Sequence, residues 1–264
     1  MLTTRFVNGA PNWLDVGSSD LDGAISFYSG LFGWQFQSAG PDAGGYGFFQ
    51  LDGRTVAGGM QVGADQAPPA WTVYFQSADA EATAKAVEQA RGTVLFQPMD
   101  VMGKGHMAVF ADAAGCVFGV WQPGETKGVD VAGETGSLTW VELYTPDVAA
   151  AAAFYHAALG LETSAAPMPG GDYTCVNPGG AGDDAMFGGV VPLDAHPATT
   201  PPPHAFWLPY FEVADTDATV ARAQELGGAV TVPATSVQGV GTMAHLTDPY
   251  GARFAVIRSE SPQG

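Results

Sequence analysis

Hydrophobic and polar positions alternate in short runs along this chain, and a helical pattern follows the first run. Residues 13–16 (WLDV) alternate between apolar and polar-edged side chains, as a half-buried strand does. Asp20 then stands at an expected helix N-cap, and apolar residues recur at helical spacing until Gly33 stops the pattern. Three short strand patterns follow, up to residue 62. This order predicts a βαβββ unit.

The same order returns three more times. A strand pattern starts at Trp71 and leads into a helical pattern over 79–90, which Gly92 ends before three further strands. The second half of the chain matches the first at an offset of 127 residues, which pairs Trp13 with Trp140. Farther along the offset is 136, which locates an insertion in the proline-rich stretch PLDAHPATTPPPH, a predicted loop.

The repeats predict an α+β protein made of four βαβββ units, two in each half of the chain. We expect a first domain over residues 1–124, a linker over 125–137 and a second domain over 138–264.

Charge and composition narrow the range of binding partners that we expect. The chain has 27 acidic and 9 basic residues, a net charge of -18, so nucleic acid and anionic membrane surfaces are not expected partners. Apolar runs end well before the roughly 20 residues that a membrane span needs. The start of the sequence does not resemble a signal peptide, and the only cysteines, Cys116 and Cys175, form no CxxC motif. We expect a soluble cytoplasmic protein, a monomer or a homodimer.

Three motifs carry a family resemblance over nearly the whole chain. The pattern D-x-x-x-A-x-x-F-Y-x-x-x-x-G occurs at 20–33 and 147–160, W-x-x-Y-F strands follow, and D-x-x-G-x-x-F occurs at 112–118 and 248–254. The chain thus resembles the vicinal oxygen chelate superfamily, which includes glyoxalase I, bleomycin-resistance proteins and extradiol dioxygenases. It is also similar to a tandem bacterial branch often labelled glyoxalase-like or hydroxylase. The resemblance implies curved, mostly antiparallel sheets around cavities.

The resemblance also implies particular sequence positions for metal ligands, and the residues at these positions can be checked. Chemistry in this superfamily usually depends on a divalent metal held by His, Gln or Glu at fixed strand positions. Here the corresponding positions are Trp13, Thr72, Gly119, Trp140, Leu208 and Ala255. None of these side chains can replace imidazole or carboxylate as a ligand, so we expect no metal and no other cofactor.

The strand phase then predicts which side chains line the cavities. Side chains alternate between the two faces of a strand, so residues in phase with the six positions should point inward. The opposite face is uniformly apolar, as at Leu14 and Val16, which supports this phase. The predicted ligand-binding residues are Trp13, Asp15, Tyr74, Gln76, Trp121, Trp140, Glu142, Tyr144, Tyr210 and Arg253.

Two interpretations of this lining stay open. It suits a flat or partly apolar organic ligand, or else Trp13 and Trp140 simply fill the space that a metal would occupy. Glu142 either pairs with Arg253 as a structural ion pair or acts as a general base.

Other polar or small residues have structural interpretations. His106 and His245 are interpreted as hydrogen-bonded wall residues and Cys116 as an inert core thiol. The glycine pairs at 58–59 and 188–189 predict bulges or close backbone approaches.

Three functions compete at this point. The leading hypothesis is a metal-free protein that sequesters a small aromatic or apolar metabolite, as in resistance. The second is a cofactor-independent or unconventional enzyme of secondary metabolism, a hydroxylase, lyase or isomerase, with Asp15 or Glu142 as proton acceptor and a tyrosine at the oxyanion. The third, a metal-dependent glyoxalase or dioxygenase, conflicts with the residues at the ligand positions.

Overall fold

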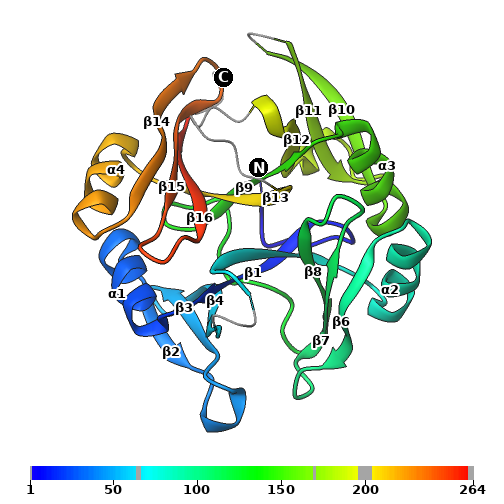
Figure 1. The fold of residues 1–264 in the computed structure, drawn as a ribbon, viewed down its shortest axis with the longest axis horizontal. Helices are drawn as coiled ribbons and strands as arrows, with labels where there is room; N and C mark the ends of the chain where they lie inside the picture. Colours follow the sequence, from blue (N-terminus) through cyan, green and yellow to red (C-terminus); the bar gives the residue numbers. More distant parts are fainter. Residues whose placement is uncertain (1, 64–66, 169–170, 196–203, 261–264) are drawn as a thin grey trace. The chain divides into compact units, whose positions relative to one another are not determined.

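The computed structural model describes residues 2–63, 67–168, 171–195 and 204–260 of the 264-residue chain. Its helices and strands form four modules, each with one strand, one helix and three further strands (Figure 1). Module A comprises β1 (Pro11–Ser18), α1 (Leu21–Phe32), β2 (Gln35–Ser38), β3 (Gly47–Leu51) and β4 (Arg54–Gln61). Module B comprises β5 (Ala70–Gln76), α2 (Ala80–Gln89), β6 (Thr93–Asp100), β7 (Gly105–Ala111) and β8 (Val117–Pro123). Module C comprises β9 (Leu138–Thr145), α3 (Val148–Leu159), β10 (Leu161–Met168), β11 (Gly171–Pro178) and β12 (Gly188–Pro192). Module D comprises β13 (Phe206–Glu212), α4 (Thr216–Glu225), β14 (Ala229–Val237), β15 (Gly241–Thr247) and β16 (Arg253–Ser259).

The strands form two eight-stranded sheets of the same topology. Their orders are β2-β3-β4-β1-β5-β8-β7-β6 and β10-β11-β12-β9-β13-β16-β15-β14. Within each module the last three strands are antiparallel, and the first strand pairs in parallel with the fourth, as β1 does with β4. The prediction of an α+β fold with four βαβββ units is therefore confirmed.

Each helix begins at an aspartate whose carboxylate caps it. Asp20, Asp79, Asp147 and Asp215 each accept a hydrogen bond of 2.9 to 3.0 Å from the backbone N–H three residues ahead. Helices α1 and α3 end at glycines in the left-handed conformation, with φ of 74° at Gly33 and 69° at Gly160, as the sequence predicts.

Backbone contacts divide the chain into two compact units that do not coincide with its sequence halves. Unit 1 is residues 1–14, 72–128 and 140–207, and unit 2 is residues 15–71, 129–139 and 208–264. Unit 1 thus unites most of modules B and C, and unit 2 unites most of modules A and D. The domain boundaries expected at 124 and 138 concern a different division of the chain and stay a prediction.

Aromatic side chains fill the core of each unit. In unit 1, Phe75 and Phe118 from the strands of module B contact Tyr155 of α3, with ring centroids 6.4 and 5.3 Å apart. In unit 2, Phe211 of β13 lies 5.2 Å from Phe32 of α1. Phe75, Phe118 and Phe211 belong to the strand face that the sequence predicts to be apolar, and all three are fully buried.

A buried hydrogen-bonded corner ties the two modules of each unit together. In unit 2, the Tyr28 hydroxyl of α1 donates to Asp248 Oδ2 at 3.1 Å and accepts from the Trp71 indole at 2.9 Å. The other carboxylate oxygen, Oδ1, accepts the backbone N–H groups of Tyr250 and Ala252, both at 2.9 Å. We call this arrangement the Tyr28–Asp248 corner.

Unit 1 contains the equivalent Tyr155–Asp112 corner. The Tyr155 hydroxyl donates to Asp112 Oδ2 at 3.2 Å and accepts from the Trp207 indole at 2.9 Å. Asp112 Oδ1 accepts the backbone N–H of Cys116 at 2.9 Å. Burial raises the pKa of both corner carboxyls and raises the pKa of the Tyr28 and Tyr155 hydroxyls and of the Cys116 thiol well above their usual values. Cys116 is therefore held as an unreactive buried thiol.

In the described part of the chain, none of the helices has the length and apolar character needed to cross a bilayer.

Candidate functional site

A carboxylate on strand β9 holds a cluster of aromatic hydroxyl and indole groups in unit 1. Trp140, Glu142 and Tyr144 alternate along β9, so their side chains share one face of the strand. Tyr144 donates its hydroxyl to Glu142 Oε2 at 2.9 Å, and Tyr173 of β11 donates to Oε1 at 2.7 Å. The Trp140 indole N–H donates to the Tyr173 hydroxyl at 3.0 Å. We call these four residues the Glu142 cluster.

Burial gives the Glu142 cluster its chemical character. Glu142 is only 8% exposed, and hydrogen bonds are electrostatically stronger in such low-dielectric surroundings. Burial, together with the Glu142 carboxylate, raises the pKa of Tyr173 well above its usual value. Tyr173 therefore stays protonated at neutral pH and remains a donor. The cluster therefore presents a carboxylate acceptor, from Glu142, next to the phenol groups of Tyr144 and Tyr173 and the indole of Trp140.

The first half of the chain holds a related arrangement in unit 2. Asp15, the counterpart of Glu142, is 6% exposed and accepts the Tyr46 hydroxyl at 3.3 Å. The position equivalent to Tyr144 is Gly17, which supplies no second hydroxyl from the same strand. Asp15 is also shorter than Glu142 by one methylene. The two halves thus place a carboxylate at the same strand position with different hydrogen-bond donors.

Glycines make room for the tyrosines of both sites. Gly58 of β4 lies opposite Asp15, and Gly189 of β12 lies opposite Glu142. A Cβ at Gly58 would overlap the Tyr46 hydroxyl, and a Cβ at Gly189 would overlap the Tyr173 hydroxyl. These glycines are therefore the close approaches that the sequence suggests as one of two interpretations.

The two tyrosines were missed by the strand-phase argument. That argument tests the first strand of each module and the strands that carry the expected ligand positions, whereas Tyr46 precedes β3 and Tyr173 lies on β11. The offset of 127 residues that pairs Asp15 with Glu142 also pairs Tyr46 with Tyr173. Searching the repeat for polar residues that recur at that offset could have found them.

The other predicted residues occupy several places in the two units. In unit 1, Trp13 of β1 stacks on Trp121 of β8 with ring centroids 6.4 Å apart, and Tyr74 lies opposite Gly119 on the neighbouring strand β8. Gln76 ends β5, where its backbone pairs with Gly9 and Ala10.

In unit 2, the Tyr210 hydroxyl hydrogen-bonds His245 Nε2 at 2.9 Å, and His245 is buried. His106, by contrast, is exposed. Burial lowers the pKa of the half-buried Arg253. Glu142 and Arg253 belong to different units, so their pairing stays a prediction, as does a common cavity for the ten residues.

The donor set does not fit the family's metal. At the closing-strand position, a side chain on Gly119 would overlap the ring of Tyr74, so the space where a ligand side chain would start is occupied by an aromatic ring. Leu208 and Ala255, at corresponding positions in unit 2, are buried apolar residues. Among the described residues, no three His, Cys, Asp or Glu side chains gather as a metal site would require.

The sequence and the fold of this chain are similar to those of known proteins. The model of the glyoxalase/bleomycin resistance protein/dioxygenase superfamily matches residues 10–120 and 137–256. The chain is similar to the anthracycline biosynthesis protein DauV of Streptomyces sp. (strain C5), with 43% identity over 96% of this chain and 94% of DauV. The anthracycline biosynthesis protein DnrV of Streptomyces peucetius matches with the same identity and coverage. In structure, the chain is similar to the 2,3-dioxygenase LapB from Pseudomonas sp. KL28, with a TM-score of 0.65, 14% identity, and coverage of 98% of this chain and 96% of LapB.

Proposed function

Because the chain belongs to the glyoxalase/bleomycin resistance protein/dioxygenase superfamily, we propose that it binds a small aromatic metabolite without the help of a metal. The observation that carries the proposal is the presence of Trp, Thr, Gly, Leu and Ala at the family's ligand positions, with the Tyr74 ring lying over Gly119. The side chains at these positions cannot coordinate a metal ion. Their apolar and aromatic groups are of the kind that flat organic ligands contact.

The Glu142 cluster supplies the polar part of this recognition. A carboxylate with two phenol donors can accept a hydrogen bond from a ligand hydroxyl, and the Trp140 ring adds an aromatic face. Two relatives take their names from anthracycline biosynthesis, and anthracyclines are flat, fused aromatic molecules that bear phenolic hydroxyls. We therefore propose a polyketide-type aromatic metabolite as the ligand, bound for sequestration or resistance.

Tryptophan fluorescence tests the binding proposal. Titration with an anthracycline aglycone should quench the fluorescence saturably, because Trp140 lies in the Glu142 cluster. Glu142→Gln should weaken binding at least tenfold, which is the loss of one charge-assisted hydrogen bond. His106→Ala, at an exposed histidine outside the cluster, is the control and should bind like the wild type. Failure of the wild-type protein to bind any of a panel of fused aromatic compounds would contradict the proposal.

Elemental analysis gives an independent test. The purified protein should contain no stoichiometric transition metal, and chelation should leave aromatic binding unchanged. One transition metal per chain, lost together with ligand binding on chelation, would instead revive a metal-dependent glyoxalase or dioxygenase.

A second function is favoured by one observation, the neutral Tyr173 donor beside the Glu142 carboxylate. In a cofactor-independent enzyme, Glu142 or Asp15 would accept a proton from the substrate while a tyrosine stabilised the developing oxyanion. Mass spectrometry of aromatic substrates after incubation with the protein should then show product. Turnover that Glu142→Gln and Asp15→Asn both leave unchanged would remove this alternative.

A further inference from the structure

The two units differ where their helices meet. Helices α1 and α4 lie side by side in unit 2, and helices α2 and α3 lie side by side in unit 1 (Figure 1). In unit 2, Arg222 of α4 donates its Nε–H to the carbonyl of Gly30, in the last turn of α1, at 3.2 Å. Leu226 packs on the same spot, since a Cβ at Gly30 would lie 2.9 Å from its Cδ2. The seam of unit 2 is filled by its own side chains.

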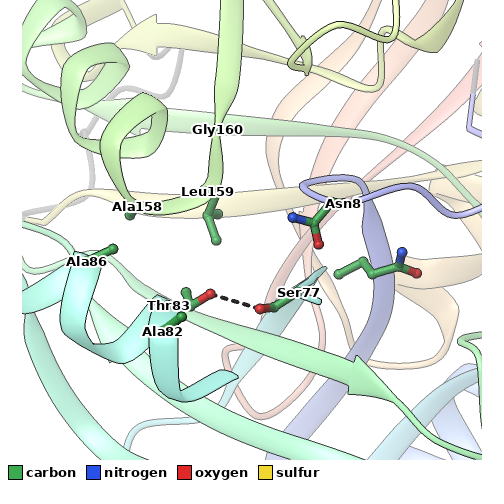
Figure 2. Close-up of a pocket in the computed structure, with 9 residues that line it drawn as sticks. Asn8, Ser77, Ala82, Thr83, Ala86, Ala158, Leu159 and Gly160 are labelled. Carbon is green, nitrogen blue, oxygen red and sulfur yellow. Dashed lines mark hydrogen bonds between the residues drawn. The ribbon is translucent and has the colours of Figure 1, made fainter. Parts of the chain in front are cut away.

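The seam of unit 1 lacks both of these fillers. The repeat places Ala86 at the position of Arg222 and Ala90 at the position of Leu226, an offset of 136 residues. A pocket of about 270 Å³ lies here, lined by Asn8, Gln76, Ser77, Ala82, Thr83 and Ala86 and by residues 158–160 (Figure 2). Ala86 thus borders the pocket at the position where unit 2 carries a long cationic side chain, and the counterpart of Gly30 is Ala157, next to the lining residue Ala158.

The polar groups of the pocket suit a small hydrogen-bond donor. Residues 158–160 end α3, where the last carbonyls of a helix lack intrahelical partners and the helix dipole presents its negative end. The Gly160 carbonyl accepts the backbone N–H of Gly179 at 2.9 Å, so the acceptors considered for a ligand are the carbonyls of Ala158 and Leu159. Figure 2 shows the Asn8 amide on one side and, on the other, the Ser77 and Thr83 hydroxyls, which hydrogen-bond each other at 2.8 Å. The lining contains no Lys or Arg that would repel a cation. The net charge of -18 also favours a cationic ligand over an anionic one.

We propose that this pocket is a binding site for a small organic cation that carries a guanidinium or primary ammonium group, held by the carbonyls of Ala158 and Leu159 at the end of α3. The ligand would lie beside Ala86, the repeat counterpart of Arg222 in unit 2. At about 270 Å³ the pocket is smaller than the roughly 300 to 1,000 Å³ typical of sites for drug-sized molecules, so it suits a fragment and not a fused aromatic system. The site is separate from the Glu142 cluster and goes beyond the proposed aromatic ligand.

Titration of the full-length protein with N-ethylguanidinium, followed by amide NMR, tests the site. Saturable shifts are expected at Thr83, Ala86 and Leu159. N-ethylurea has the same shape and similar donors without the charge, so it should bind at least tenfold more weakly. Equal binding of the two compounds, or shifts that never saturate, would overturn a cation site.

Variants based on the duplicated seam make the test specific. Ala86→Arg copies the side chain of unit 2 into the pocket and should weaken guanidinium binding at least tenfold, and Ala86→Leu should do the same by filling the space without charge. Gln89→Arg adds the same charge at an exposed position of α2 outside the pocket and is the matched control. Arg222→Ala should create a second guanidinium site, seen as new shifts at Gly30. Unchanged binding in both Ala86 variants would overturn the proposal, whatever the result for aromatic ligands.

Discussion

The two Tyr–Asp corners are nearly identical, whereas the two strand-borne carboxylates are not. The tyrosine to aspartate distances are 3.1 Å in the Tyr28–Asp248 corner and 3.2 Å in the Tyr155–Asp112 corner, and in each a tryptophan indole donates to the tyrosine at 2.9 Å. On the strands, the hydrogen bond from Tyr46 to Asp15 measures 3.3 Å, while those from Tyr173 and Tyr144 to Glu142 measure 2.7 and 2.9 Å.

This difference distinguishes residues that stabilise the fold from residues that could bind a ligand. Each corner satisfies buried polar groups that would otherwise destabilise the fold, so the same solution serves both units. The strand carboxylates face different demands, because only Glu142 has a second hydroxyl from its own strand and the longer side chain to reach both. We infer that the Glu142 cluster, and not Asp15, is the principal polar site of the proposed function.

Removing a corner carboxylate should have the largest effect on stability. Asp112→Ala and Asp248→Ala each leave backbone N–H groups and a tyrosine hydroxyl buried without an acceptor, a loss of about 3 kcal/mol in the free energy of unfolding. Urea unfolding followed by circular dichroism measures it. The equivalence of the corners predicts losses within about 1 kcal/mol of each other. A large loss in one variant and none in the other would break the comparison.

Adding a methyl group at Gly189 should have the next largest effect. The new Cβ displaces the Tyr173 hydroxyl and strains the strand pair, a loss of about 1 to 3 kcal/mol. Gly58→Ala displaces Tyr46, whose bond to Asp15 is longer, so its loss should be smaller. Thermal unfolding gives the ranking. In Gly189→Ala alone, NMR should show a shifted Trp140 indole proton, because that proton is donated to Tyr173.

Deleting the tyrosine hydroxyls should sharpen the contrast between the strand sites. Tyr173→Phe removes a donor to Glu142 and the acceptor for Trp140, so we expect about 1 to 2 kcal/mol loss of stability and at least tenfold weaker aromatic binding. Tyr46→Phe removes the longer 3.3 Å bond to Asp15 and should cost less than about 1 kcal/mol, with little change in binding. Equal effects of the two variants on binding would show that Asp15 and Glu142 serve the ligand alike.

The pH dependence of stability should show the smallest effect. Burial raises the pKa of Asp112 and Asp248 above the ordinary value of 3.8, so the folded protein keeps these protons to a higher pH than the unfolded chain does. Their contribution to the free energy of unfolding is therefore greatest below 3.8 and is lost as pH rises through the raised pKa. Relative to Asp112→Asn or Asp248→Asn, the wild type should lose stability across that window. Urea midpoints measured at a series of pH values would show no such trend if burial left these carboxyls unshifted.

Most of the fold could be predicted from the sequence because its signals are local. Asp20 and Gly33 mark the ends of α1 within one helical pattern, and the internal repeat carries that pattern to the other three modules. The pairing of modules A with D and B with C could not be predicted in this way. The contact of Tyr28 with Asp248 joins residues 220 positions apart, and no local pattern specifies such a partner.

The candidate site was predicted in part for the same reason. The phase of strand β9 indicates that Trp140, Glu142 and Tyr144 share a face, since alternation is a property of one strand. Tyr173 reaches Glu142 from another strand, and it can do so only because Gly189 leaves room for its ring. Such cross-strand geometry depends on the register of three strands, which the sequence pattern alone does not fix.

Tyr28 and Asp248 are 220 residues apart in the sequence, and this separation determines which unit can fold first during protein synthesis. The ribosome releases the chain from its N-terminus, so Asp112 and Tyr155, 43 residues apart, emerge well before Asp248 does. Segment 15–71 must wait for almost the whole chain before it can bury Tyr28, Phe32 and Trp34 against its partner module. A nascent chain that stalls after residue 207 would contain a nearly complete unit 1 and, in segment 15–71, aromatic side chains that nothing yet covers, and this species would depend most on a chaperone.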